Sequence, residues 1–407
     1  LFSFFSKKRT PSGHTPTGRA ADISLSRAPR RIRPEEHGID RNAISRNALR
    51  VVRTLQQNGH VAYLVGGCVR DLLIGRKPKD FDVVTDATPQ RIKDIFRFAR
   101  IIGRRFRIVH IPFGTEIIET ATFRALPPPG GSDEMLVRDN VYGSEREDAV
   151  RRDITINALF YDPVGELIID YVDGYKDIKR RVVRIIRDPR QSYIEDPVRM
   201  IRALKYQATT GFGIEADSYN PIRELGELVA GCSTARVMEE IYKILRSAAS
   251  RATLSALFRS GLLAHMAPEV AGHLAAGNAR EFENTPLGTR LAALDRLTAG
   301  GRHYPNPVLL AVLFADLVAE TVSTNHHADP MVTAAAWIDP VSRRMNFSRM
   351  NKDQLLRILT SQNRFANPQK KPKAGQLALC RREYFREALN FFEIVCLANG
   401  LGTDDIA

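Results

Sequence analysis

The chain has 407 residues, 43% of them hydrophobic and 26% charged, and its formal net charge is +14 at pH 7. This length and composition predict a globular protein of two or three domains, and no apolar run is long enough to span a membrane. Excess positive charge attracts polyanions, which favours nucleic acid as the partner over the alternative of a merely solvated basic surface. The four scattered cysteines form no C-x-x-C pair, which argues against zinc and disulfides and fits a reducing, cytoplasmic environment.

Residues 1–40 predict a flexible basic arm. The segment is rich in Pro, Gly, Ser and Arg, and Asp22 is the one acidic residue before Arg33. A composition of this kind does not bury enough apolar surface to fold by itself. We expect the arm to touch nucleic acid; a transit peptide is the alternative.

The following segment predicts a small mixed α/β domain, because helical and alternating apolar patterns succeed one another within about eighty residues. Helices are predicted over 44–58, 67–75 and 89–99, and strands over 61–67, 79–86, 105–114 and 115–124.

The segment at 125–135 is rich in Pro and Gly, and it predicts either a mobile flap or a tolerated surface insertion. After Asp153 the pattern is mostly helical. It includes one short pair of strands, at 166–173 and 181–186, and a surface helix within 375–400.

Two carboxylates lie in the stretch VGGCVRDLLIGRKPKDFDVVT, residues 65–85. Asp80 and Asp82 are two apart on a predicted strand, so their side chains share a face. Neighbouring like charges repel unless water screens them or a cation neutralises them, and oxygen-only ligands suit Mg²⁺. The alternative is that both are solvent-facing residues of an edge strand, but the apolar residues around them indicate a mostly buried strand.

A third acid, Glu119, lies on a later predicted strand that could present it to the same face. Three carboxylates can hold two Mg²⁺ ions, an arrangement that serves phosphoryl or nucleotidyl transfer. Glu116 is the competing choice. We prefer Glu119 because it lies deeper in the apolar run.

A glycine pair, Gly66 and Gly67, separates a predicted strand from a short helix. Glycine permits positive φ and close backbone approach, so such a turn can form an anion site. Arg70 follows the glycine pair, and the D-x-D motif begins ten residues after Arg70. We expect the glycine turn to bind phosphate, Arg70 to supply positive charge and the two aspartates to bind a metal ion beside a triphosphate.

These residues resemble a known family, the class II nucleotidyltransferases, which comprise the bacterial poly(A) polymerases and the tRNA CCA-adding enzymes. The resemblance rests on four ordered motifs: LVGGCVRDLLIGRKPKDFDVVTDATP, ETATFR, RRDITINALFYDP and YIEDPVRMIRALKYQATTGF. It implies that Asp80, Asp82 and Glu119 are catalytic metal ligands.

The resemblance also implies an α+β fold, in which a small mixed-sheet nucleotidyltransferase head is followed by all-helical neck, body and tail domains. We place the head at 41–163. The neck, with the base-recognition helix and an RNA-binding region, is placed at 164–260, and an RNA-binding body and tail at 261–407.

Two further motifs add residues that the resemblance assigns to nucleotide binding. Arg152 and Asp153 precede a predicted helix that carries Asn157, and together they would orient sugar and phosphates. The simpler alternative is that Asp153 caps this helix beside surface arginines.

On the helix opened by EDPVRMIR, Asp196 and Arg199 lie three residues apart, and Arg202 is close by. The resemblance implies that Asp196 and Arg199 read the base. Such a pair suits adenine or cytosine, because both present an amine beside an acceptor nitrogen. A role of Asp196 as a helix N-cap is the alternative.

The stretches IIGRRFRIVHI and RDNVYGSEREDAVRRD resemble the polymerase branch of the family. We therefore expect template-independent addition of AMP from ATP to an RNA 3′ end, with release of pyrophosphate. The expected partners are two Mg²⁺ ions, ATP as substrate, and single-stranded 3′ ends of mRNA and other transcripts, with the protein acting as a monomer and not on a membrane. The alternatives are CCA addition to tRNA and an inactive RNA-binding relative.

Overall fold

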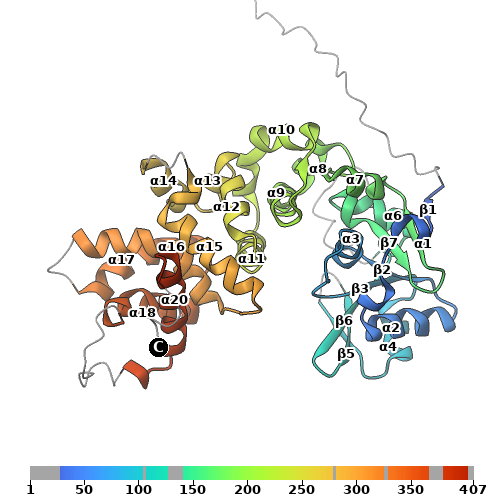
Figure 1. Ribbon diagram of the computed structural model, residues 1–407, viewed down its shortest axis with the longest axis horizontal. Coiled ribbons are helices and arrows are strands. Elements are labelled where there is room, and N and C mark those ends of the chain that lie inside the picture. The colour runs from blue at the N-terminus through green and yellow to red at the C-terminus, as the bar shows by residue number, and fades with distance from the viewer. Residues whose placement is uncertain are drawn as a thin grey trace, which may run out of the picture.

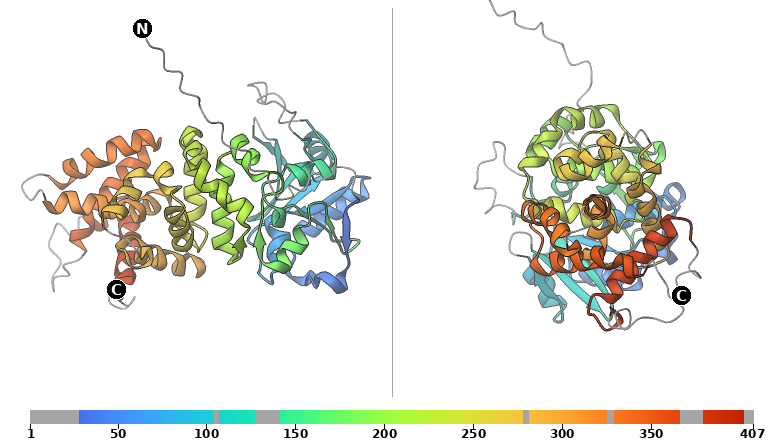
Figure 2. Two further views of the ribbon diagram at one scale, coloured as in Figure 1. Left: turned by 90° about the horizontal axis from the view of Figure 1, so that it is seen from above. Right: turned by 90° about the vertical axis from the view of Figure 1, so that its left-hand side faces the viewer.

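The computed structural model describes residues 28–103, 107–126, 141–277, 281–324, 329–365 and 379–401. The predicted arm up to residue 27 and most of the loop predicted at 125–135 lie outside these residues. The molecule is elongated, with a strand-rich head at one end and the last helices at the other (Figure 1). The view from above gives the same order (Figure 2).

The head is built on one mixed sheet of eight strands, in the order β1-β8-β7-β2-β3-β6-β5-β4. The pair β3·β6 is parallel and the other neighbouring pairs are antiparallel. The strands are β1 (Arg30–Ile32), β2 (Ala62–Val65), β3 (Asp82–Thr85), β4 (Arg100–Ile102), β5 (Ile108–Phe113), β6 (Glu116–Thr122), β7 (Leu159–Asp162) and β8 (Leu167–Asp170).

The two faces of this sheet bury different apolar sets. Alternate residues of a strand point to opposite faces, and accordingly Leu64 and Val83 join one cluster while Val65 and Val84 join the other. The first cluster includes residues of α2 (Arg46–Gln57), α3 (Gly67–Leu73) and α4 (Pro89–Ile95), and the second includes residues of α6 (Glu145–Arg151). The predicted helices and strands of this region are thereby confirmed.

The sheet extends beyond the predicted head boundaries of 41–163. β1 lies in the segment predicted as a flexible arm, and it pairs with β8, which lies in the segment predicted as neck. A segment of three residues, two of them arginines, is too short and too polar for a strand to be predicted from sequence. It is recognised as a strand only through its pairing with β8. A short helix, α1 (Pro34–His37), follows β1.

Two sequence predictions in the middle of the chain are wrong. The strands predicted at 166–173 and 181–186 do not pair with each other, because β8 is held between β1 and β7, while β9 (Val182–Val183) pairs with β10 (Gly213–Ile214). The helix predicted to carry Asn157 is a single 3₁₀ turn, η2 (Thr155–Asn157). The aromatic residues after it are drawn into the sheet as β7, where Phe160 and Tyr161 are buried.

The described residues after the head are mostly helical. The first group includes α7 (Gly174–Arg180), α8 (Pro189–Glu195), α9 (Val198–Thr210), α10 (Ala216–Leu225) and α11 (Thr234–Leu245). The second includes α12 (Ser250–Arg259), α13 (Leu263–Met266), α14 (Pro268–Ala276), α15 (Pro286–Ala299), α16 (Asn306–Thr324), α17 (Pro330–Arg344), α18 (Arg349–Ser361) and α20 (Phe385–Ala398). Further 3₁₀ turns are η1 (Arg41–Ala43), η3 (Gly226–Gly231), η4 (Phe282–Asn284) and η5 (Gln362–Arg364).

The surface helix predicted within 375–400 is confirmed in its second half, where α20 runs from Phe385 to Ala398. In the described part of the chain, no helix combines the length and the apolar character needed to cross a bilayer.

Candidate active site

The parallel pairing of β3 with β6 sets two carboxylates side by side. Asp82 is the first residue of β3, and its register partner on β6 is Glu119. Partners in register project to the same face of a sheet, so both side chains lie on the face that α6 covers. The competing acid Glu116 is the first residue of β6 and precedes the part of β6 that pairs with β3; it accepts a hydrogen bond from Asn47 Nδ2 at 2.6 Å. The structure therefore brings Glu119, and not Glu116, to Asp82.

Asp80 lies just before the strand instead of on it, because β3 begins only at Asp82. Phe81 between them is buried, and both aspartates are exposed. β3 itself is held between β2 and β6, which excludes the explanation that these are residues of an edge strand. An interior strand thus begins at one solvent-accessible carboxylate, Asp82, and a second, Asp80, precedes it by two residues.

Asp80 and Glu119 are near enough to Asp82 for their charges to act on its carboxylate. The surrounding protein partly desolvates Asp82, and the negative charges of Asp80 and then Glu119 add to this effect, so the pKa of Asp82 rises to about 7. The nearby Arg152 acts in the opposite direction. Carboxylates whose pKa values are raised by burial and by one another are typical of functional sites.

Arg152 directs part of its guanidinium at this cluster. Its Nε and Nη2 donate to Asp148 Oδ2 at 3.1 and 2.7 Å, and the rigid pairing fixes the plane of the guanidinium. A Cβ at Gly66 would lie 3.7 Å from Arg152 Nη1 and 3.8 Å from Asp82 Oδ2. Gly66 also has a φ of +82°, so any other residue would be strained there. The predicted glycine turn is therefore confirmed as a close approach between backbone, cation and carboxylate.

Arg70 and Asn157, both predicted to bind nucleotide, are bonded to each other. Arg70 Nη1 donates to Asn157 Oδ1 at 2.7 Å, and Arg70 Nε donates to Asp71 at 2.9 Å. The guanidinium also lies 5.3 Å from the ring centroid of Tyr206 on α9, and its Nη2 lies 3.5 Å from the position of a Cβ on Gly67. Arg70 thus joins the glycine turn to η2 and to the helical neck.

Asp153 connects the head to α9 through an ion pair. Its Oδ2 lies 2.8 Å from Nε of Arg202, and the Asp153 side chain is 8% exposed. Burial opposes its ionisation, but the charge of Arg202 and the amide of Ile154 outweigh burial, so the pKa of Asp153 falls below its ordinary value. Asp153 is not the cap of a helix, because η2 has no side-chain cap.

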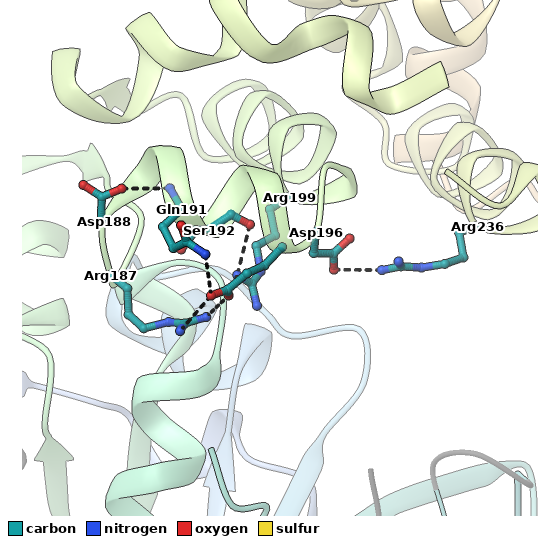
Figure 3. Close-up of polar contacts among 8 residues, drawn as sticks. Arg187, Asp188, Gln191, Ser192, Asp196, Arg199 and Arg236 are labelled. Carbon is teal, nitrogen blue, oxygen red and sulfur yellow. Dashed lines mark hydrogen bonds and ion pairs between the residues drawn. The ribbon is translucent and has the colours of Figure 1, made fainter. Parts of the chain in front are cut away.

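The predicted base-reading pair does not form a direct contact (Figure 3). Asp196 Oδ2 accepts a hydrogen bond from Arg236 Nη2 of α11 at 2.8 Å. Arg199 Nη1 instead donates to the carbonyl of Ser192 at 3.2 Å and lies 3.5 Å from Glu195. The alternative role of Asp196 as an N-cap fails, because α9 has no side-chain cap. In the described part of the chain, Asp196 Oδ1 is buried and has no hydrogen-bond partner.

Three residues near the site escaped the sequence analysis. Asp148 orients Arg152, His110 lies 3.5 Å from Glu119 as its register partner on β5, and Arg236 holds Asp196. The i, i+4 spacing of Asp148 and Arg152 was a readable signal. Arg236 gave none, because forty residues separate it from Asp196 and only the packing of α11 brings them together.

Magnesium suits this donor set in its chemistry. Asp80, Asp82 and Glu119 offer only hard oxygen ligands, and their mutual repulsion is what a divalent cation relieves. Among the described residues, no group of three or more His, Cys, Asp and Glu is gathered closely enough to hold a metal ion. Of the three predicted ligands, the sheet places Asp82 and Glu119 side by side, and Asp80 lies on the segment that leads into β3.

The amino-acid sequence is similar to those of known poly(A) polymerases and CCA-adding enzymes. Residues 62–184 match the poly(A) polymerase head domain, and residues 211–274 match a probable RNA- and SrmB-binding site of polymerase A. Poly(A) polymerase I of Haemophilus influenzae is 41% identical over 292 residues, covering 70% of this chain and 64% of its own length. A CCA-adding enzyme of Bacillus licheniformis is 35% identical over 222 residues, covering 53% of this chain and 54% of its own.

A solved structure extends the likeness to the fold. The crystal structure of the Bacillus stearothermophilus CCA-adding enzyme in complex with CTP matches with a TM-score of 0.61 and 25% identity, over 88% of this chain and 79% of that one. The chain spans less than two thirds of the length of the two curated relatives named above. The matched head, the mixed sheet and the carboxylates on β3 and β6 make this chain similar to the poly(A) polymerases and the CCA-adding enzymes.

Proposed function

We propose that this protein adds AMP from ATP to the 3′ end of RNA without a template and releases pyrophosphate. The observation that carries this proposal is the register of Asp82 with Glu119, beside a glycine turn that Arg152 approaches. Greater identity to a poly(A) polymerase than to a CCA-adding enzyme supports adenylate as the product.

Asp80, Asp82 and Glu119 would hold Mg²⁺. When bound, Mg²⁺ supplies Lewis acidity to the attacking hydroxyl and neutralises charge on the leaving pyrophosphate. Around this point the chain contributes its own positive charge. Arg152 Nη1 faces Gly66, so a phosphate that approaches the glycine turn meets a guanidinium already oriented by Asp148.

Asp196 and Arg199 supply the means to choose a base. The partnerless Oδ1 of Asp196 is suited to accept a hydrogen bond from an exocyclic amine, and Arg199 is suited to donate to the adjacent ring nitrogen. Guanine and uracil present a carbonyl and an N–H at these positions, which would leave Asp196 and Arg199 unpaired. The ion pair between Arg202 and Asp153 connects this helix to the head.

The RNA substrate is the single-stranded 3′ end of mRNA and other transcripts, which the protein binds as a monomer in the cytoplasm. The net charge of +14 supports a polyanionic partner. The matched RNA-binding segment at 211–274 supports contact with RNA in the neck and the helices that follow it.

Purified protein is incubated with a single-stranded RNA primer, Mg²⁺ and one labelled nucleoside triphosphate at a time. We expect extension by a long tract with ATP and little extension with CTP, GTP or UTP. A variant that lacks both aspartates, Asp80→Ala with Asp82→Ala, is the matched negative control. Full activity in that variant would remove the basis of the proposal.

The second candidate is CCA addition, which the structural likeness to a CCA-adding enzyme favours. A tRNA without its terminal CCA separates the two functions. If labelled CTP is incorporated into this tRNA and extension by ATP stops after one residue, CCA addition replaces polyadenylation. If neither substrate is extended while RNA is still bound, the protein is an inactive RNA-binding relative.

A further inference from the structure

The sheet of the head ends at β4, which pairs with β5 on one side and, among the described residues, with no strand on the other. Alternate residues of such an edge strand direct amide and carbonyl groups outward, where the sheet gives them no partner. β5, which borders β4, lies on the opposite side of the head from the neck helices α8 and α9 (Figure 1). The matched RNA-binding segment at 211–274 contains no part of this edge.

Large apolar side chains are exposed on both faces of the sheet at this edge. Ile102 of β4 is 45% exposed, and its register partner Ile108 is half-buried on the same face. Phe98, which precedes β4, is 51% exposed, and its ring centroid lies 5.8 Å from that of Phe113. Phe113 lies on the opposite face, where the guanidinium of Arg50 from α2 is 5.8 Å from its ring centroid.

This distribution of apolar groups favours an added strand over a docked helix. A helix laid on the sheet would cover the apolar side chain on one face only. The side chains of a strand alternate between the two faces, so one added strand would cover both Phe98 and Ile102. Its backbone would also satisfy the outward amide and carbonyl groups of β4.

The edge is also basic. Arg97, Arg100 and Arg107 are exposed around β4, and in the described part of the chain none of them forms an ion pair. Pairing of β4 with a second copy of this chain would bring these arginines together, and the like charges would repel. The charge therefore favours an occupant with acidic side chains.

An alternative explanation is an edge that is only protected against association. Proteins protect edge strands by keeping them short and by placing charges on them, and β4 has three residues and carries Arg100. Protection does not account for Phe98 and Ile102, because exposed apolar side chains beside unpaired backbone groups promote association. The edge is therefore suited to select one kind of chain.

We propose that β4 binds an extended acidic segment of a partner protein, which adds to the eight-stranded sheet as a further, antiparallel strand. The segment would place apolar residues opposite Ile102 and Ile101 and an acid opposite Arg100, so its recognition sequence is two apolar residues followed by an acid. RNA fits this edge less well, because a phosphodiester backbone does not reproduce the pairing of amide and carbonyl groups along a strand.

The added strand would lie near the candidate active site without covering it. Arg100 of β4 is the register partner of His110, and His110 is the register partner of Glu119 on β6. At the usual spacing of neighbouring strands, the added strand would be about 14 Å from β6. The proposal therefore does not depend on the proposed function, and docking should leave the reaction of a short primer unchanged.

The probe is a fluorescein-labelled peptide with the core Val-Val-Glu and one glutamate on each side of the core. One control peptide has the same composition in scrambled order. A second control keeps the sequence but carries N-methylated valines, which removes backbone donors and preserves the charge. Binding to the full chain is measured by fluorescence anisotropy, and amide hydrogen exchange over residues 98–108 is compared with and without the peptide.

The test variant combines Phe98→Ser with Ile102→Thr, which removes exposed apolar groups and keeps a β-branched residue on the strand. The matched control combines Val164→Thr with Val332→Thr. It removes side chains that are 54% and 65% exposed from the turn between β7 and β8 and from α17. Thermal unfolding confirms that both variants fold.

We expect the core peptide to bind the wild type and to slow hydrogen exchange over 98–108. The scrambled and N-methylated peptides should bind at least tenfold more weakly. The edge variant should bind the core peptide about tenfold more weakly, because two half-exposed apolar side chains are lost from the contact. Arg100→Ala should weaken binding about threefold, as expected for one cross-strand charge pair. The control variant should bind like the wild type.

The proposal is overturned if the core peptide does not bind, if the N-methylated peptide binds equally well, or if the edge variant binds like the wild type. Protection of 98–108 by single-stranded oligoadenylate and not by the peptide would instead identify an RNA surface. A dimer in sedimentation velocity that is lost in the edge variant would identify a second copy as the occupant. Failure of the wild type to extend a short primer would count against the proposed function alone, because the peptide measurements do not involve catalysis.

Discussion

The acidic residues of the head and those of the neck are organised in opposite ways. In the head, Asp82 lies beside Glu119 and near Asp80, and the repulsion among them raises the pKa of Asp82 to about 7. In the neck, Asp196 is paired with Arg236, and Arg199 lies near Glu195. In the head, the nearby charge of Arg152 does not offset the repulsion at Asp82, whereas in the neck Asp196 has a direct ion-pair partner. The comparison supports the proposal that the first takes up a cation and the second exchanges one hydrogen-bond partner for another.

The largest effect is expected from Asp82→Asn. We expect AMP incorporation to fall by about a thousandfold or more, because loss of one carboxylate removes several kcal/mol of transition-state stabilisation by metal. Initial rates with a short RNA primer and ATP measure the loss. Without Mg²⁺, the same variant should unfold at a higher temperature than the wild type, because the repulsion is relieved. Addition of Mg²⁺ should stabilise the wild type and not the variant.

A smaller effect is expected on the choice of base. Asp196→Ala and Arg199→Ala should each lower the preference for ATP over GTP by roughly 10- to 100-fold, which is the discrimination usual for a paired set of hydrogen bonds to a base edge. The ratio of kcat/KM for the two nucleotides measures this preference. Arg190→Ala is the matched control, because Arg190 pairs with Glu224 on the surface of the same region. An unchanged ratio in both test variants would rule out the assigned role.

The link between head and neck gives a third prediction, which concerns stability. Asp153→Asn leaves Arg202 without its partner, and we expect a loss of about 2 kcal/mol in the free energy of unfolding, less than for a fully buried pair because Arg202 is partly exposed. Urea denaturation measures it.

Because the pKa of Asp153 is lowered in the folded state, the stabilisation is complete above the unfolded pKa of about 3.9 and is lost as the pH falls through the folded value. The difference between wild type and variant should therefore be constant near neutral pH and should shrink below about pH 4. A difference that grew in acid would contradict the assigned cause.

The smallest effect is expected at the other acid of β6. Glu116→Gln should change activity by less than about twofold and stability by less than about 0.5 kcal/mol, since Glu116 bonds Asn47 away from the cluster and lies near the surface. Initial rates and thermal unfolding measure both. A large loss of activity here would mean that Glu116, and not Glu119, serves the cluster.

Much of the head could be predicted from the sequence, because its signals are local. The alternation in β2 and β3, the glycine pair and the D-x-D spacing each act over a few residues, and the structure places them as expected. What could not be predicted depends on distant pairing. β1 is a strand only because β8 accepts it, and Leu159–Asp162 is a strand only because it lies between β8 and β2.

The candidate site divides in the same way. The position of Glu119 deeper in the apolar run was enough to prefer it over Glu116, but the sequence could not show that Asp80 precedes the strand instead of lying on it. The partners of Asp196 and Arg70 also depend on how helices from different domains pack together. An isolated sequence motif specifies which groups are present and leaves open which of them neutralise one another.

The parallel register of β3 against β6 affects the fraction of folded molecules in which Asp82 and Glu119 lie side by side. If one strand slipped by a single residue, Asp82 would turn to the face that α2, α3 and α4 cover, and Val83 would turn to the face that α6 covers. A molecule with the wrong register would bury the carboxyl group of Asp82 among apolar side chains. The free-energy cost of this burial would destabilise the misaligned fold. Molecules that fold therefore carry these acids in register, so under the proposed function the active fraction of a preparation should equal its folded fraction.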